Sequence, residues 1–404
     1  MLDVKRIRQD FPILKKGIIY FDNAASSLTP EPVIEKMLEF YREYRANVGR
    51  GVHRLAQAAS EEFEAARRRI ARFINADSPL EVIMTRNATE GINIIANGLK
   101  WSGGDKVVTT LIEHHSNFIV WLRAKKKYGV EIEVVKPTES FEKGLFKISD
   151  FEKAIDDKTK LVSITHVSNV LGVVLPVREI AEISHEHGAL VLVDGAQSVP
   201  HMKIDVQDLN CDFLAFSGHK MCGPTGSGAL YMREEHMSSV EPLCIGGGTI
   251  ADVGVDYYEL EEGPSRFEAG TPAIGDVIGL GAAVEYLESV GMENISKHED
   301  ELTRRIYSGL TSIDDVEVYG PEPGRKSGIT SFNIRGLNPH DVAMALDSMA
   351  NIMVRSGHHC ALPTTKELIR RQGSVRASVY LYNTIEETEQ FILAVEKLAK
   401  NAGG

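Results

Sequence analysis

Residues 213–220 read FLAFSGHK, an apolar run that passes directly into a serine, a glycine, a histidine and a lysine. The apolar run predicts a strand that is buried on both faces, with Lys220 just beyond its carboxyl end. Residues 189–198, ALVLVDGAQS, repeat this arrangement, because their apolar run ends in Asp194. Only one βα unit fits between Asp194 and Lys220, so we expect both side chains at the same edge of a parallel sheet.

Short apolar runs alternate with amphipathic stretches over most of the chain. This alternation predicts an α/β fold, with a mostly parallel sheet flanked by helices on both faces. After about residue 270 the order changes, and the pattern predicts a smaller α+β domain. The expected strands cover residues 82–85, 106–110, 131–135, 161–168, 189–194, 213–217, 228–232, 316–319, 330–335 and 352–355. The expected helices cover residues 89–99, 116–128, 176–187, 273–290, 297–312, 339–350 and 385–401.

The change of pattern also gives the expected domain organisation. We predict a large domain over residues 21–270 and a small domain over residues 271–404. Residues 1–20 are expected to form an N-terminal segment that packs with the small domain. The chain carries no low-complexity linker, so we expect the two domains to be packed together rather than tethered.

The composition is that of a globular protein, with 43% hydrophobic and 25% charged residues among 404. The net charge of -12 argues against a general binder of nucleic acid or of anionic membranes. The apolar runs are too short to span a bilayer, and no signal-peptide pattern opens the chain. We therefore expect a cytoplasmic protein.

Four cysteines stand at positions 211, 222, 244 and 360 and form no CxxC pair. This spacing supports neither a zinc ribbon nor a thioredoxin-type motif, and we expect no metal site. Cys360 lies in the loop RSGHHCALP, residues 355–363. Positive neighbours favour the thiolate, so this loop is consistent with a reactive cysteine, although a buried and inert thiol remains open.

Lys220 and Asp194 suggest a particular chemistry. A partly desolvated lysine can form a Schiff base with pyridoxal phosphate, and a carboxylate can pair with the protonated pyridine nitrogen of that cofactor. Residues 87–91, NATEG, open an expected helix, where backbone N–H groups and the Thr89 hydroxyl can hold a phosphate. Each feature also has an ordinary alternative: a solvated strand end for the lysine, a turn for the aspartate, and a helix cap at Asn87 or Thr89.

Ordered motifs along the whole chain carry a resemblance. The chain resembles the class V branch of the fold type I pyridoxal-phosphate enzymes, and more closely the SufS-like cysteine desulfurases. The loop with Cys360 separates that group from relatives that lack the cysteine. The motifs that carry the resemblance are FDNAA at 21–25, NVGRGVH at 47–53, EHHSN at 113–117, SNVLG at 168–172, DGAQS at 194–198, SGHK at 217–220, FEAGTP at 267–272, RSGHHCALP at 355–363 and VRAS at 375–378.

The resemblance implies a role for each matching position. Lys220 matches the Schiff-base lysine and the base that moves the Cα proton, and Asp194 matches the partner of the pyridine nitrogen. Arg355 and Arg376 match the ligands of the substrate carboxylate, a task that suits the guanidinium fork, although surface ion pairing is open for either one alone. His114 matches a residue that stacks on the cofactor ring and is also placed for catalytic proton transfer. Gln197 matches the donor to the phenolic oxygen, and Asn169 lies near that oxygen and the substrate. The implied phosphate ligands are Thr89, Ser217, His219 and, from the partner subunit of a homodimer, Thr271.

The implied reaction converts L-cysteine to L-alanine and leaves the sulfur on Cys360 as a persulfide. The resemblance implies that a scaffold or shuttle protein of iron–sulfur cluster assembly then takes the sulfur. The alternatives are a selenocysteine lyase, another class V lyase or transaminase, and a scaffold without catalysis. Ala88 departs from the resembling family, which often carries a threonine there, so we expect a modest change in cofactor affinity.

Overall fold

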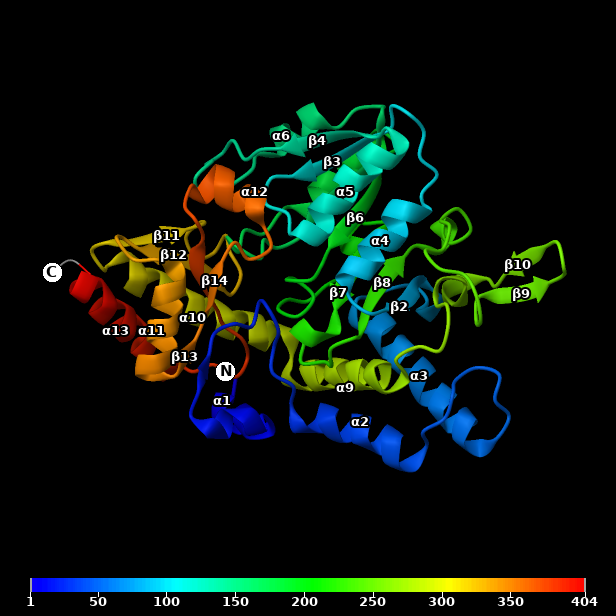
Figure 1. Ribbon diagram of the computed structural model, residues 1–404, viewed down its shortest axis with the longest axis horizontal. Coiled ribbons are helices and arrows are strands. Elements are labelled where there is room, and N and C mark those ends of the chain that lie inside the picture. Colours follow the sequence, from blue (N-terminus) through cyan, green and yellow to red (C-terminus); the bar gives the residue numbers. More distant parts are fainter. Residues whose placement is uncertain (1, 403–404) are drawn as a thin grey trace.

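The computed structural model describes residues 2–402, and its centre is a seven-stranded sheet with the order β2-β8-β7-β6-β5-β3-β4 (Figure 1). All neighbouring strands are parallel except β8, which runs antiparallel to β2 and β7. The mostly parallel α/β sheet expected from the sequence is therefore confirmed. The strands are β2 (Val82–Thr85), β3 (Lys106–Thr110), β4 (Glu131–Val135), β5 (Thr159–Thr165), β6 (Leu190–Asp194), β7 (Phe213–Ser217) and β8 (Gly228–Met232).

Both faces of this sheet are covered, which explains the uninterrupted apolar runs. Along β7, Phe213 and Ala215 pack in one cluster with the helices α4 (Ala88–Gly98) and α5 (His115–Tyr128). Leu214 and Phe216 point to the opposite face and pack in a second cluster, to which three long helices contribute many residues. Those helices are α3 (Arg54–Phe73), α7 (Val177–Glu186) and α9 (Ile274–Val290), and α2 (Glu31–Glu43) packs on α9.

The remaining helices and turns are short or lie after the large sheet. They are α1 (Val4–Ile7), α6 (Ile148–Ala154), α8 (Val206–Leu209), α10 (Met292–Thr311), α11 (Pro339–Ala350), α12 (Leu362–Thr364) and α13 (Ile385–Ala402), with the turns η1 (Arg8–Asp10), η2 (Pro12–Lys16), η3 (Pro79–Glu81), η4 (Gly218–Lys220), η5 (Glu234–His236), η6 (Gly263–Phe267) and η7 (Thr365–Ile369). Over residues 2–402, no helix combines the length and apolar character that crossing a bilayer requires.

A second, four-stranded antiparallel sheet follows, with the order β11-β12-β15-β14. It packs against α10, α11 and α13 at the left of Figure 1. Its strands are β11 (Val316–Tyr319), β12 (Ile329–Ile334), β14 (Arg355–Gly357) and β15 (Ser374–Ser378). The division into domains at residue 270 stays a prediction.

Three sequence expectations differ from the structure. The strand expected at 352–355 is wrong as one unit: β13 (Ile352–Met353) pairs with β1 (Ile19–Tyr20), and β14 pairs with β15. The strand expected at 161–168 ends at Thr165, because residues 166–175 fold back into a turn with Gly172 in the left-handed region. Helix α10 begins five residues earlier than expected, directly after the turn at Gly291.

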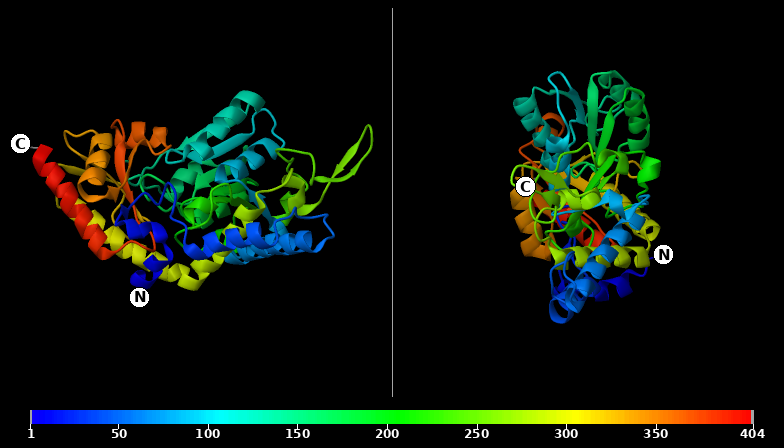
Figure 2. Two further views of the ribbon diagram at one scale, coloured as in Figure 1. Left: turned by 60° about the horizontal axis from the view of Figure 1, so that its bottom comes forward. Right: turned by 90° about the vertical axis from the view of Figure 1, so that its right-hand side faces the viewer.

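A hairpin of β9 (Ile250–Val253) and β10 (Tyr258–Leu260) projects from the large sheet, and Figure 2 shows it extending away from the body of the molecule. Its apolar side chains are exposed at Val253, Val255, Tyr257 and Tyr258. The hairpin has no cluster of its own to bury them in, so these side chains are available to another surface.

Candidate active site

A cavity of about 240 Å³ opens at the carboxyl edge of the large sheet, between this sheet and the second one. Parallel strands present their carboxyl ends to the same edge, which is where α/β proteins bind ligands. The cavity is lined by all the residues predicted from the sequence except one. They are Thr89, His114, Asn169, Asp194, Gln197, Ser217, His219, Lys220, Arg355, Cys360 and Arg376. Thr271 lies between η6 and α9 and does not line this cavity.

Asp194 ends β6, and Lys220 ends the turn η4 that directly follows the neighbouring strand β7, so both lie at one sheet edge as the spacing predicted. Asp194 is buried, and its Oδ1 accepts a hydrogen bond from the Ala196 N–H at 3.0 Å. Burial lowers the pKa of Lys220 to about 8, although the nearby Asp194 opposes the shift. Burial also raises the pKa of Asp194, with Lys220 opposing. The lysine amine is therefore available in its nucleophilic, neutral form much closer to neutral pH than a solvated lysine.

The start of α4 forms one end of the cavity. Asn87 caps the helix, since its side chain accepts from the Glu90 N–H at 3.0 Å, so the cap reading is correct for Asn87. The Ala88 N–H donates to Ser217 Oγ at 2.9 Å, and the hydroxyls of Thr89 and Ser116 are 2.7 Å apart. Backbone N–H groups at a helix start and a set of hydroxyls make this end suited to an anion.

Glycine permits the close approach at this end. A Cβ on Gly228 would lie 2.6 Å from the Phe216 carbonyl oxygen and 2.8 Å from the Asn87 Cα. The loop before α4 therefore rests directly on the strand β8, which brings Asn87 beside Ser217.

Two histidines in the cavity are held neutral. His114 caps α5, and its Nδ1 accepts from the Ser116 N–H at 3.1 Å. Burial and the nearby Lys220 lower the pKa of His114 to about 3 and the pKa of His219 to about 4. Neutral imidazoles can stack on a flat ligand and accept or donate one hydrogen bond without adding charge.

Two buried side-chain amides line the cavity, and the oxygen of each has no hydrogen-bond partner among residues 2–402. Asn169 donates its Nδ2 to the His359 carbonyl at 2.7 Å, and Gln197 donates its Nε2 to the Ala24 carbonyl at 2.7 Å. Asn169 Oδ1 and Gln197 Oε1 are buried and accept no hydrogen bond from any described residue. Buried polar atoms normally have partners, so these two oxygens favour a polar ligand in the cavity.

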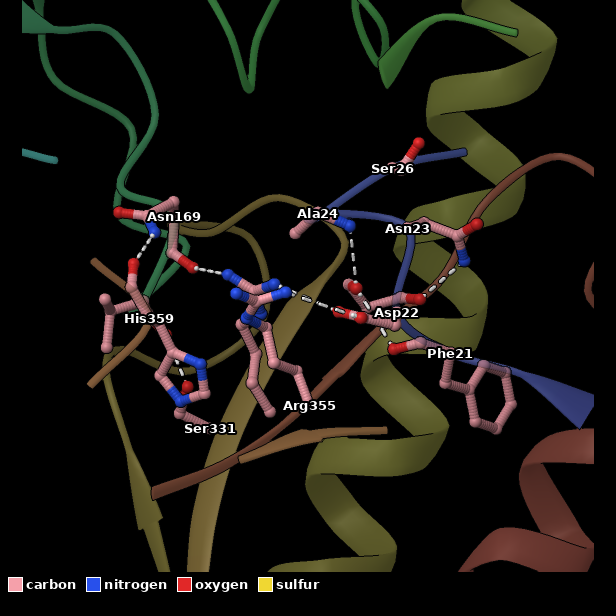
Figure 3. Close-up of polar contacts among 12 residues, drawn as sticks. Phe21, Asp22, Asn23, Ala24, Ser26, Asn169, Ser331, Arg355 and His359 are labelled. Atoms are coloured by element: carbon pink, nitrogen blue, oxygen red, sulfur yellow. Dashed lines mark hydrogen bonds and ion pairs between the residues drawn. The ribbon is translucent and has the colours of Figure 1, made fainter. Parts of the chain in front are cut away.

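Arg376 and Arg355 meet at the side of the second sheet, where they are partners in the register of β15 and β14. Figure 3 shows Arg355 beside Asp22. Arg376 is 2% exposed; it donates to the Asn169 carbonyl at 2.8 Å and to Asp22 Oδ1 at 3.2 Å. Arg355 lies 3.8 Å from Asp22 Oδ2. Burial lowers the pKa of Arg376 to about 10, although Asp22 opposes the shift. Asp22 lies in the motif FDNAA at 21–25, and the resemblance implied no role for it.

Cys360 is exposed at the cavity, so the open alternative of a buried thiol is wrong. His359 and Cys360 both lie in the left-handed region, with φ of 51° and 56°. Hydrogen bonds hold this unusual turn: the Cys360 carbonyl accepts from the His115 N–H at 2.7 Å, and the Leu362 N–H donates to His115 Nε2 at 3.0 Å. The turn presents the thiol to the cavity and gives His115 a role in holding the loop.

Comparison with known proteins identifies the family of this chain. The family model for aminotransferase class V matches residues 19–391. The chain is 49% identical over 399 residues to a probable cysteine desulfurase of Pyrococcus abyssi, covering 98% of this chain and 97% of the relative. A probable cysteine desulfurase of Methanothermobacter thermautotrophicus is 46% identical over 396 residues, covering 97% of each chain.

Solved structures give the same result. The apo structure of a cysteine desulfurase from Thermococcus onnurineus is 47% identical, with a TM-score of 0.94 and 99% coverage of both chains. The S-sulfonic acid form of the Escherichia coli cysteine desulfurase CsdA is 30% identical, with a TM-score of 0.92 and the same coverage. The chain therefore belongs to the class V aminotransferase family, in the branch that holds these cysteine desulfurases.

Proposed function

We propose that this protein is a cysteine desulfurase that removes the sulfur of L-cysteine and leaves L-alanine. The observation that carries the proposal is the cavity itself, which is lined by the Lys220 amine, the Arg376 guanidinium and the exposed Cys360 thiol. These groups are an amine for the cofactor, a ligand for the substrate carboxylate and a nucleophile for sulfur. The similarity to cysteine desulfurases over almost the whole chain supports the same activity.

The cofactor we propose is pyridoxal 5'-phosphate, and the lining residues fit it. The helix start at Thr89, with Ser217 and His219, suits the phosphate, Asp194 suits the pyridine nitrogen, and Lys220 suits the aldehyde carbon. His114 would stack on the ring, while Gln197 and Asn169 would serve its phenolic oxygen. When bound, the cofactor supplies an electron sink for the pair of electrons left at Cα.

The protein's own residues then have distinct tasks. Arg376 and Arg355 would bind and orient the substrate carboxylate, and the Lys220 amine would remove the Cα proton. The Cys360 thiolate attacks the substrate Sγ. The bond between Cβ and sulfur breaks as the new sulfur–sulfur bond forms, and the bonding electron pair leaves with Cβ. Cβ takes up one proton, equivalent to the one lost by the Cys360 thiol, and Lys220 returns a proton to Cα. Cys360 then carries a persulfide, and the carbon skeleton leaves as alanine.

We also propose that the active form is a homodimer. Thr271 lies outside the cavity of its own chain, which supports a contact with the partner's cofactor phosphate. The projecting hairpin exposes four apolar side chains, and Val52 on a separate loop is 87% exposed. Soluble monomers rarely expose apolar groups in this way, and closed two-fold dimers are the most frequent oligomers.

The sulfur on Cys360 must leave for the enzyme to turn over. We propose transfer to a scaffold or shuttle protein of iron–sulfur cluster assembly in the cytoplasm. The exposure of Cys360 supports such a transfer, because an acceptor thiol can approach a persulfide at the surface.

Substitution of Cys360 by alanine tests the proposal most sharply. The variant should bind the cofactor and still change its visible spectrum on addition of cysteine, because those steps use Lys220 and Asp194. Alanine release should fall by a factor on the order of a hundred or more, because the nucleophile is gone. The matched control is Cys244→Ala, which removes an exposed thiol that does not line the cavity and should leave the rate unchanged. If Cys360→Ala released alanine at the wild-type rate, a lyase would be the better assignment, and selenocysteine should then be tested as substrate.

A further inference from the structure

The segment Phe21–Ser27, FDNAASS, touches both sheets but has no task in the proposed reaction. Phe21 donates its N–H to the Met353 carbonyl at 2.9 Å, and its carbonyl accepts from the Ser378 N–H at 2.7 Å. The Ala24 carbonyl accepts from Gln197 Nε2, and the Ser27 N–H donates to the His219 carbonyl at 2.9 Å. Hydrogen bonds therefore hold the backbone on both sides of Asp22, and its carboxylate points toward the arginine side chains (Figure 3).

Asp22 faces two guanidinium groups from that fixed place. Its Oδ1 accepts from Arg376 at 3.2 Å, and its Oδ2 lies 3.8 Å from Arg355. Arg376 has a second fixed contact to the Asn169 carbonyl, while its Nε is buried and donates to no group within residues 2–402. Asp22 itself does not line the cavity, whereas both arginines do. It therefore lies behind the arginines and leaves donors of Arg376 and Arg355 free for a ligand.

The charges of the cluster formed by Asp22, Arg355 and Arg376 do not cancel completely. Two arginines and one aspartate leave one positive charge. An L-amino acid substrate brings one carboxylate, which would bring the whole cluster to neutrality. Without Asp22, two positive charges would face the cavity, and a ligand with two negative charges would balance them better.

We propose that Asp22 is a positioning residue that makes this subsite selective for a single carboxylate over a dianion. It holds the Arg376 guanidinium in place and cancels one of the two positive charges behind the cavity. The inference rests on the proposed function only in taking Arg376 and Arg355 as the ligands of the substrate carboxylate.

The test is Asp22→Asn in the cofactor-loaded enzyme, because bound cofactor keeps anions out of the phosphate end. The amide oxygen can still accept from Arg376, so the substitution removes the charge and keeps the contact. The probes are sodium acetate and sodium sulfate at constant ionic strength. Their dissociation constants are measured from the rise of the melting temperature with anion concentration, and again by competition with L-cysteine.

Electrostatic energy scales with the charge of the ligand, so the two anions should respond differently. If removal of the Asp22 charge tightens acetate by about tenfold, it should tighten sulfate by about the square of that factor, or a hundredfold. Asp22→Glu should keep a ratio of acetate to sulfate dissociation constants close to that of the wild type. The matched control is Asp315→Asn, which removes a carboxylate from an exposed pair with Arg335 and should move neither constant. If Asp22→Asn does not fold, the same measurements are made on Asp22→Ser.

Equal changes for acetate and sulfate, or no change for either, would overturn the inference. The gain for sulfate must also disappear in the double variant with Arg376→Ala, since a gain that persists would place the anion elsewhere. Anion binding requires no turnover. Failure of cysteine desulfuration would therefore refute the proposed function and leave this measurement standing.

Discussion

Glu113 is a buried carboxyl group directly before the cavity histidine, and its replacement by glutamine should change how stability depends on pH. Its Oε1 accepts from Thr110 Oγ1 at 2.5 Å and from the Thr165 N–H at 3.0 Å, and its Oε2 accepts from Asn117 Nδ2 at 2.7 Å. Complete burial raises the pKa of Glu113 from 4.5 to about 8 despite these donors, and the nearby Asp194 adds to the rise.

The size and sign of the effect follow from this shift. A carboxyl whose pKa is higher in the folded state contributes stability that is complete below pH 4.5 and is lost as the pH rises through 8. Each unit of pKa difference is worth about 1.4 kcal/mol, so about 5 kcal/mol of stability disappears over this range. Glutamine does not titrate. The free energy of unfolding of Glu113→Gln minus that of the wild type should rise by about 4 kcal/mol from pH 5 to pH 8.

Urea unfolding of both proteins at fixed protein and cofactor concentration measures this difference. Groups that titrate in both proteins, such as Asp194, cancel from it to first order. Ser163→Ala is the control, because Ser163 donates to Asn117 Oδ1 at 2.6 Å in the same buried network but does not titrate. The decrease in the free energy of unfolding caused by Ser163→Ala should be the same at every pH. A constant difference between Glu113→Gln and the wild type would show that the carboxylate is ionised in the fold and would refute the reasoning.

Three further predictions concern the site and the assembly. Lys220→Ala should fold but lose the lysine-linked visible absorbance, and borohydride reduction that fixed the cofactor to another lysine would contradict the assignment. Arg376→Ala should lower kcat/KM for cysteine, with a loss of transition-state stabilisation on the order of 2–5 kcal/mol, while cofactor binding is retained. Unchanged kinetics would leave Arg355 as the carboxylate ligand. Val255→Asp at the exposed hairpin should weaken the dimer in light scattering, and a wild-type monomer with full activity would exclude the dimer altogether.

The large sheet was predictable because its strands are buried on both faces and read as apolar runs. The short strands were not: β14, β15 and β1 carry arginines, serines or only two residues, and their identity depends on partners far along the chain. Helices α2 and α3 were also missed, since their apolar positions are spread among charged residues that face solvent. The sequence pattern at 352–355 indicated extended backbone, but it could not indicate which of two sheets would take each half.

The predicted site residues, apart from Thr271, do line one cavity, and this part could be obtained from strand ends and from the resemblance. Asp22 was missed because its importance depends on a contact across 354 residues with Arg376, which no local pattern contains. The buried network of Glu113 was missed for the same reason. Its donors come from the end of β3, from helix α5 and from the end of β5, and only the fold brings them together.

The contact between Phe21 and Ser378 also determines the order in which parts of this protein can fold during its synthesis. Ser378 Oγ donates to the Phe21 carbonyl, and the two residues are 357 positions apart. At about 5–20 residues per second, a ribosome needs roughly 20–70 s between them. The strands that carry Lys220 and Asp194 can form during that interval, whereas Asp22 must wait for Arg376. A nascent chain stalled before β15 should therefore present the amine and its aspartate while the substrate carboxylate still has no closed site.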